Sequence, residues 1–150
     1  MDVDEFAAIF SRYGQIDETY LRGTYLRFQI TKDLATRGRP APLRILDVGA
    51  HWLFQSALYA LDGHVITAAD LPIMRSNPVV SGVAQELGIE LVYYGNLRDP
   101  DELGRLDSDA FDLILFTEII EHITFNPVRM WTMFHRLLKP AGSVIVTTPN

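Results

Sequence analysis

The stretch "ILDVGAHWL", Ile45 to Leu53, decides how the rest of the chain is interpreted. The apolar run before Gly49 is typical of a buried strand, and the glycine favours a tight turn directly after it. A strand that leads into a ligand-binding turn is commonly followed by further glycines, but His51 and Leu53 stand at those positions. The loop therefore either holds a ligand in a different way or no longer holds one.

Strand and helix patterns alternate after this stretch, and they predict the fold class. Asn77 and Pro78 give one of the helices a typical N-terminus. Strands separated by helical crossovers run parallel and are covered on both faces, so we expect an α/β fold with a doubly wound, mostly parallel sheet. The expected strands are 43–48, 64–69, 89–94, 111–116 and 143–148, and the expected helices are 54–61, 77–87 and 127–138.

The segment before the first strand has a different pattern. Apolar residues recur at helical spacing from Val3 to about Arg37, with a break near Gly14, which predicts a two-helix arm. Tyrosines of this arm could close over a substrate, although docking of the arm explains them equally well. We expect a single domain over 1–150, made of the arm (1–38) and an α/β core (43–150).

Composition limits the classes of function. The net charge of -6 disfavours nucleic acid as a partner, because phosphate binding needs clustered Lys and Arg. The absence of cysteine excludes disulfides, thiolate nucleophiles and Cys-type zinc sites. The N-terminus lacks the features of a signal peptide, and no apolar run approaches the roughly 18 residues of a membrane span. These features predict a cytoplasmic protein with no membrane association.

Two carboxylates end the first two predicted strands. In a doubly wound sheet the ligand lies beyond the carboxyl ends of the strands, at the point where strand order reverses. Asp70 follows Asp47 at roughly the 20-residue distance at which an acidic residue can accept hydrogen bonds from a ribose diol. The alternative is that both are ordinary loop carboxylates.

Four segments, in this order, resemble those of one family. They are "LDVGA" (46–50), "GHVITAAD" (63–70), "FDLILFTEIIEHI" (111–123) and "LLKPAGSVIVTTPN" (137–150). Together they resemble the class I S-adenosylmethionine-dependent methyltransferases, specifically the group with an E-x-x-E-H string and an LKPGG…TPN segment. The resemblance implies a Rossmann-like methyltransferase fold, S-adenosylmethionine as cofactor, S-adenosylhomocysteine as product and a small-molecule acceptor.

The resemblance also implies site residues. Asp47 and Gly49 would lie beside the methionine part of the cofactor, and Asp70 would hold the ribose hydroxyls. Leu71 would pack on the adenine, and Asn96 would offer an acceptor to the adenine amino group. The full expected cofactor-binding set is Asp47, Gly49, Ala50, His51, Asp70, Leu71, Asn96, Leu97, Thr117 and Glu118.

The loop departs from the family pattern D-x-G-x-G-x-G at its second and third glycines. Leucine is sterically costly in the conformations that glycine permits, and histidine is tolerated somewhat better. We therefore expect the loop to follow a different path and still to bind the cofactor, with His51 lining the cleft.

The string "TEIIEH", Thr117 to His122, is expected to begin a helix after the fourth strand. Its spacing would put Glu118, Glu121 and His122 on one helical face, where they could bind a divalent metal. Some relatives, among them quinone-pathway and small-RNA methyltransferases, use the string in that way. Acidic residues are also common in a first helical turn, so metal is not favoured here. His122 is then the expected general base for an acceptor hydroxyl, because histidines titrate near neutral pH.

The predicted function is methyl transfer from S-adenosylmethionine to a small-molecule acceptor. The alternative is a degenerate methyltransferase fold with a binding or regulatory role and no catalysis. A nicotinamide-dependent oxidoreductase is disfavoured, because the sequence has no G-x-G-x-x-G.

The last predicted strand raises a separate expectation. Relatives continue after it with a further helix and about two more strands, and this strand carries no charge that would protect an open edge. We expect either that the chain is a fragment or that another subunit, such as a second copy, covers the edge of the fifth strand.

Overall fold

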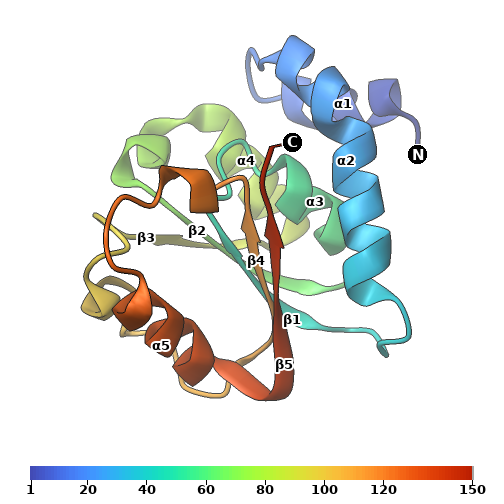
Figure 1. Cartoon of the computed structure of the whole chain (residues 1–150). Coiled ribbons are helices and arrows are strands. Elements are labelled where there is room, and N and C mark those ends of the chain that lie inside the picture. The colour runs from blue at the N-terminus through green and yellow to red at the C-terminus, as the bar shows by residue number, and fades with distance from the viewer. Residues whose placement is uncertain (150) are drawn as a thin grey trace.

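The computed structural model describes residues 1–149 and contains a five-stranded parallel sheet (Figure 1). The strand order is β3-β2-β1-β4-β5. The order reverses between β1 and β4, so the carboxyl ends of these two strands form the edge where such folds bind ligands. The predicted doubly wound α/β fold is confirmed. The strands are β1 (Arg44–Val48), β2 (Val65–Asp70), β3 (Glu90–Tyr93), β4 (Phe111–Thr117) and β5 (Leu138–Thr147).

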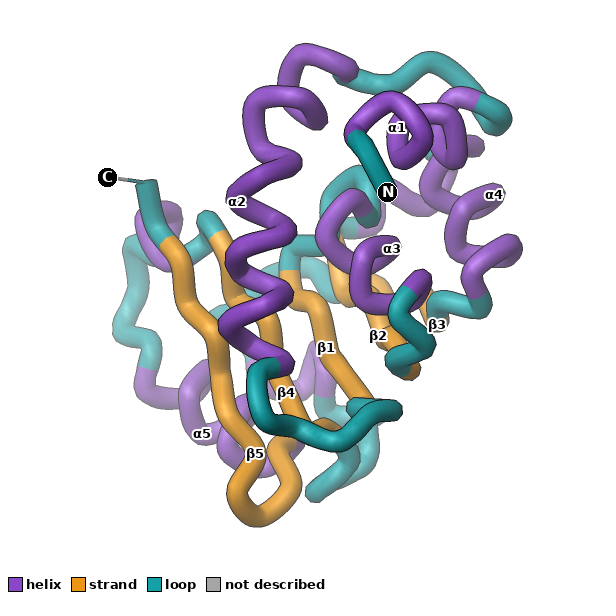
Figure 2. Tube along the Cα trace, turned by 90° about the vertical axis from the view of Figure 1, so that its right-hand side faces the viewer, coloured by secondary structure: helices purple, strands orange, loops and turns teal. Residues whose placement is uncertain are grey.

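Helices cover both faces of the sheet. The predicted two-helix arm is α1 and α2, which lie with α3 and α4 on one face, while α5 lies on the other (Figure 2). The α-helices are α1 (Val3–Ser11), α2 (Glu18–Thr36), α3 (Phe54–Leu61), α4 (Pro78–Leu87) and α5 (Val128–Leu137). Within residues 1–149 there are also three short 3-10 helices. The sequence did not indicate η1 (Pro72–Ser76) and η2 (Pro100–Leu103), whereas η3 (Ile120–His122) lies in the string that was expected to begin a helix.

Local capping explains where several helices begin. The Asp2 carboxylate accepts from the backbone N–H of Asp4 and Glu5, and the Glu5 carboxylate accepts from the backbone N–H of Asp2. The predicted Asn77 cap accepts from the backbone N–H of Val79 and Val80. These caps satisfy donors that the first helical turn would otherwise leave unpaired.

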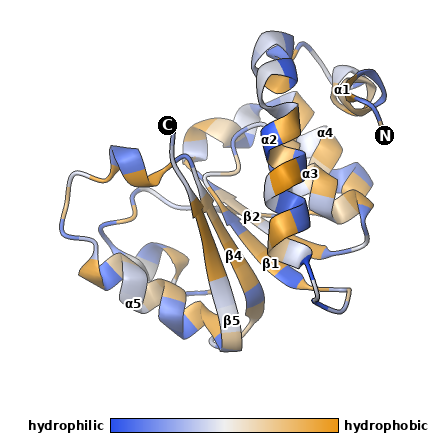
Figure 3. Cartoon of the chain, turned by 45° about the vertical axis from the view of Figure 1, so that its right-hand side comes forward, coloured by the Kyte–Doolittle hydropathy of each residue, from blue (hydrophilic) through white to orange (hydrophobic). Residues whose placement is uncertain are grey.

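The core consists of two apolar layers, one on each face of the sheet. Side chains alternate along each strand, so Ile45 and Leu113 pack towards α1–α4 whereas Leu46 and Ile114 pack towards α5. All four are fully buried. Figure 3 shows the hydrophobic strands between the two helical layers. Burial on both faces explains why the strands read as continuous apolar runs in the sequence.

The fifth strand differs from its prediction. It begins at Leu138, because that residue pairs with Phe111, and the register is irregular between Phe111 and Leu113. Within residues 1–149, β5 pairs only with β4 and forms one edge of the sheet. None of the helices in this described part of the chain combines the length and apolar character of a membrane span.

The arm is docked through a close contact between α1 and α4. The Tyr13 ring lies against Gly82, where an added Cβ would come within 2.2 to 2.7 Å of ring carbons. The Tyr13 hydroxyl donates to Glu86 at 2.6 Å, and Arg12 pairs with the same carboxylate at 2.7 Å. Only glycine at position 82 leaves room for this packing.

We predict that Gly82→Ala destabilises the protein by about 1–3 kcal/mol, because the Tyr13 ring must move. Gly23→Ala, on α2 with no neighbouring atom within 4 Å, is the matched control and should gain about 0.5–1 kcal/mol. Urea unfolding measures both variants. A Gly82→Ala protein as stable as Gly23→Ala would contradict this view of how the arm docks.

Candidate functional site

The loop after β1 has a backbone conformation that favours glycine at three positions. The φ angles are 76° at Gly49, 49° at His51 and 65° at Leu53, all in the left-handed region. These residues therefore adopt the conformations that the expectation of a different path assumed they would avoid. A non-glycine residue in this region costs roughly 1–2 kcal/mol, and burial of a leucine side chain contributes about as much or more. Leu53 is 1% exposed, so its packing offsets the strain.

His51 is held in the loop by Asp70. One Asp70 oxygen, Oδ2, accepts from the backbone N–H of His51, and Oδ1 accepts from the N–H of Leu71 at 2.6 Å. The backbone N–H of Gly49 donates to the carbonyl of Ala69 at 2.8 Å. Hydrogen bonds to a carboxylate are about twice as strong as neutral ones. The end of β2 thus fixes the loop that follows β1.

Asp47 lies at the end of β1, opposite Ala68 of β2 and Leu115 of β4. Its carboxylate is buried and accepts from the Ser56 hydroxyl of α3 at 2.6 Å. Burial raises the pKa of Asp47, the hydrogen bond from Ser56 lowers it and the charge of Asp70 raises it, and together they bring it to about 6. The site therefore holds a costly buried anion that a ligand cation would stabilise.

Gly49 provides a close approach between the loop and the segment after β4. A Cβ at this position would lie 2.3 Å from Cδ1 of Ile119. Glycine is thus required here both by its φ angle and by the space available.

Two neighbouring cavities open at this end of the sheet. The larger has a volume of about 500 Å³, and the smaller about 40 Å³. Every expected cofactor-binding residue lines at least one of them, and His122 lines the larger. His51 lines both, as expected. The residues shared by the two cavities are Tyr20, Gly49, His51, Thr117 and Glu118.

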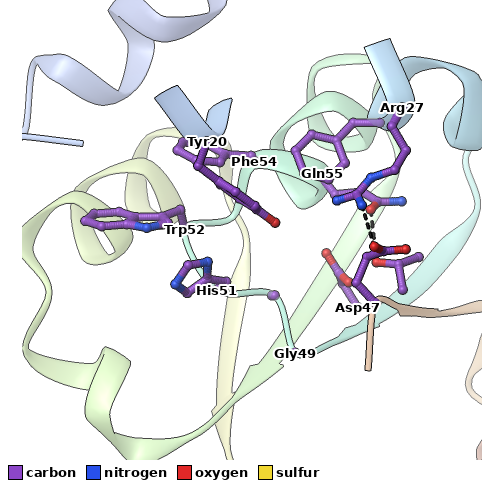
Figure 4. A pocket seen from close by; sticks show the side chains of 12 residues that line it. Tyr20, Arg27, Asp47, Gly49, His51, Trp52, Phe54 and Gln55 are labelled. Carbon is purple, nitrogen blue, oxygen red and sulfur yellow. Dashed lines mark hydrogen bonds and ion pairs between the residues drawn. The ribbon is translucent and has the colours of Figure 1, made fainter. Parts of the chain in front are cut away.

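The smaller cavity also has walls that the sequence did not indicate. Helix α2 supplies Arg27, whose Nη1 pairs with Glu118 Oε2 at 2.5 Å (Figure 4). Gln55 of α3 accepts from the Thr117 hydroxyl at 3.1 Å, and its buried Nε2 has no hydrogen-bond partner among the described residues. Nothing in the sequence around Arg27 indicates that its side chain faces the site, because it is a single arginine on a helix of the arm.

The Glu-Glu-His string is arranged differently from its prediction. Thr117 ends β4, Glu118 follows with a φ angle of 57°, and only 120–122 form a 3-10 turn. The expected common helical face is therefore wrong. Glu118 is directed to Arg27, and among the described side chains (residues 1–99 and 102–149) no group of three His, Asp or Glu is placed to hold a metal ion.

Asn96 lines the larger cavity, as expected, but its amide oxygen closes a turn. Oδ1 accepts from the backbone N–H of Arg98 at 2.9 Å and of Asp99 at 3.2 Å. Two bonds use the two lone pairs of this oxygen, so the acceptor role expected for Asn96 is taken by the loop itself.

Comparisons with known proteins agree with this geometry. Residues 46–146 match the family model described as a methyltransferase domain. The chain belongs to the class I S-adenosylmethionine-dependent methyltransferase family. A protein named ubiquinone biosynthesis O-methyltransferase from Xanthomonas axonopodis is 27% identical over 99% of this chain and 61% of its own length. One of the same name from Ruegeria pomeroyi is 30% identical over 81% of this chain and 47% of its own.

A solved structure shares the fold of this methyltransferase domain. Phosphoethanolamine N-methyltransferase 2 of Haemonchus contortus, solved in complex with S-adenosylmethionine, aligns with a TM-score of 0.67 and 17% identity. The alignment covers 96% of this chain and 31% of the other. The chain spans less than two thirds of the length of these relatives.

We predict that Asp47→Asn raises stability at pH 7.5 by up to about 3 kcal/mol, the free energy that corresponds to a pKa shift from 3.8 to about 6. A raised carboxyl pKa means that the folded state binds more protons, so this group's contribution to stability falls as pH rises through 6. The advantage of the variant should therefore shrink towards pH 4. Urea unfolding between pH 4 and 7.5 measures the difference in stability between the variant and the parent. A variant less stable than the parent at pH 7.5 would refute the raised pKa of Asp47.

Proposed function

We propose that this domain binds S-adenosylmethionine across the two cavities and transfers its methyl group to a hydroxyl of a small-molecule acceptor. The observation that carries the proposal is the continuity of the cleft. Five residues line both cavities, with Asp47 beside the smaller and Asp70 beside the larger. The cofactor has an amino-acid end and a nucleoside end, and two joined cavities of different chemistry suit it.

The smaller cavity suits the amino-acid end. Arg27 offers a guanidinium to the carboxylate, and Gln55 Nε2 is a buried donor that has no hydrogen-bond partner in the part of the chain that the structure describes. The buried Asp47 would be stabilised by the ammonium, because an opposite charge offsets the cost of burying a carboxylate. Each group of a zwitterion thus has a complement in the wall of this cavity.

The larger cavity suits the nucleoside end. Asp70 reaches its rim with both oxygens hydrogen-bonded to the backbone, and a carboxylate has further lone pairs for ribose hydroxyls. Leu71, Leu97 and Phe125 supply apolar surface for a base. The volume of about 500 Å³ is within the range of small-molecule sites.

When bound, the cofactor supplies an electrophilic methyl group on a sulfonium. The chain's own residues orient the partners and exclude water. His122 would take the proton from an acceptor hydroxyl, and its exposed position in the wall of the larger cavity supports this role. The name O-methyltransferase that the two relatives carry supports a hydroxyl acceptor.

The proposal predicts that S-adenosylhomocysteine at about 100 times its Kd stabilises the protein by about 2.7 kcal/mol and raises Tm by roughly 5–10 °C. Asp70→Asn should lose most of this shift, because a neutral amide is a poorer partner for a diol and for the loop. Asp62→Asn, a carboxylate outside both cavities, is the control and should keep the shift.

Thermal unfolding with and without the ligand measures the shift, and circular dichroism checks that each variant folds. No shift for the parent protein at millimolar ligand would favour the alternative of a degenerate fold without cofactor.

A further inference from the structure

The ion pair between Arg27 and Glu118 forms part of the wall of the smaller cavity. It joins α2 to the segment after β4 at 2.5 Å, and Glu118 Oε1 accepts from the Thr147 hydroxyl at 2.9 Å. The side chains of Arg27 and Glu118 are 36% and 19% exposed, so the pair lies at the edge of the cavity. The hydrogen bond from Thr147, at the end of β5, thus helps to hold the Glu118 carboxylate against Arg27.

The backbone at Glu118 is fixed in an unfavourable conformation. Its φ angle of 57° is in the left-handed region, and its N–H donates to the carbonyl of Thr147 at 2.9 Å. Such a conformation is unfavourable in a residue with a side chain, because Cβ comes too close to the carbonyl oxygen. The contacts with Thr147 and Arg27 maintain it and direct the carboxylate to the guanidinium.

The pair leaves little room for a ligand group. A volume of about 40 Å³ holds only a few water molecules, which is less than an α-amino-acid group needs. Arg27 is also the one arginine or lysine among the described residues that line the two cavities. A ligand carboxylate that enters this cavity therefore meets a guanidinium that is already paired with Glu118.

We propose that Glu118 is a built-in competitor for the amino-acid end of the cofactor. In the free protein its carboxylate occupies Arg27. When the ligand binds, the ligand carboxylate takes Arg27 and Glu118 turns towards solvent. The proposal rests on the proposed function and goes beyond it, because it makes Glu118 a determinant of which nucleosides bind. Glu118 weakens ligands that carry an α-carboxylate and leaves other nucleosides unaffected.

Two ligands separate this effect from general changes in the cleft. S-adenosylhomocysteine has the amino-acid end, and 5′-methylthioadenosine lacks it. We expect Glu118→Gln to bind S-adenosylhomocysteine about two- to fivefold more tightly, the range for loss of a partly exposed ion pair. Its affinity for 5′-methylthioadenosine should stay within error of the parent. Isothermal titration calorimetry measures both.

A double-mutant cycle tests whether the effect passes through Arg27. Arg27→Met should weaken S-adenosylhomocysteine but not 5′-methylthioadenosine, and adding Glu118→Gln to it should give no further gain. Lys139→Gln removes a comparably exposed ion pair, with Asp112, outside both cavities and outside the arm, and it should change neither affinity.

The outcomes distinguish this inference from the proposed function. If Glu118→Gln weakens S-adenosylhomocysteine, leaves it unchanged, or keeps its gain in the Arg27→Met background, the competitor role is wrong while cofactor binding stands. If the parent protein binds neither nucleoside, the proposed function fails and this inference fails with it.

Discussion

The carboxylate of Asp70 accepts hydrogen bonds from two backbone N–H groups, those of His51 and Leu71, and the candidate site depends on this interaction. It ties the end of β2 to the loop after β1, and so holds His51 in a conformation that usually needs glycine. Charge-assisted bonds are strong enough to offset a strain of roughly 1–2 kcal/mol. The backbone of Leu53 is kept in the left-handed region by the burial of its side chain in the core. The glycine-loop geometry thus persists where the glycine pattern does not.

The charges around the cleft divide it into two parts. The smaller cavity combines the buried anion Asp47 with the cation Arg27, an arrangement that suits a zwitterion. The larger cavity has Asp70 at its rim and apolar side chains beyond it, which suits a nucleoside. The arm contributes directly to this division, because α2 supplies Arg27 and Tyr20. Docking of the arm through Tyr13 on Gly82 is therefore part of how the site is built.

The sequence predicts those features that depend on local patterns. Apolar runs and periodicity locate the strands and long helices, and Asn77 marks the start of α4, because these signals come from neighbouring residues. The sequence did not indicate the conformation at Glu118. That conformation depends on hydrogen bonds with Thr147, at the end of β5, which is distant from Glu118 in the sequence. Arg27 was missed for the same reason. The positive φ angle of His51 could not be predicted from steric cost alone, because the contact with Asp70 that offsets this cost joins distant residues.

A crystal structure of the chain grown with S-adenosylhomocysteine tests the central claim most directly, namely that a loop with His51 and Leu53 still forms a cofactor site. The account predicts positive φ angles at both residues, as in the free protein, with the ribose hydroxyls on Asp70. It also predicts the ligand carboxylate on Arg27. A structure in which His51 leaves the left-handed region, or in which the ligand lies away from the Asp70 carboxylate, would contradict it.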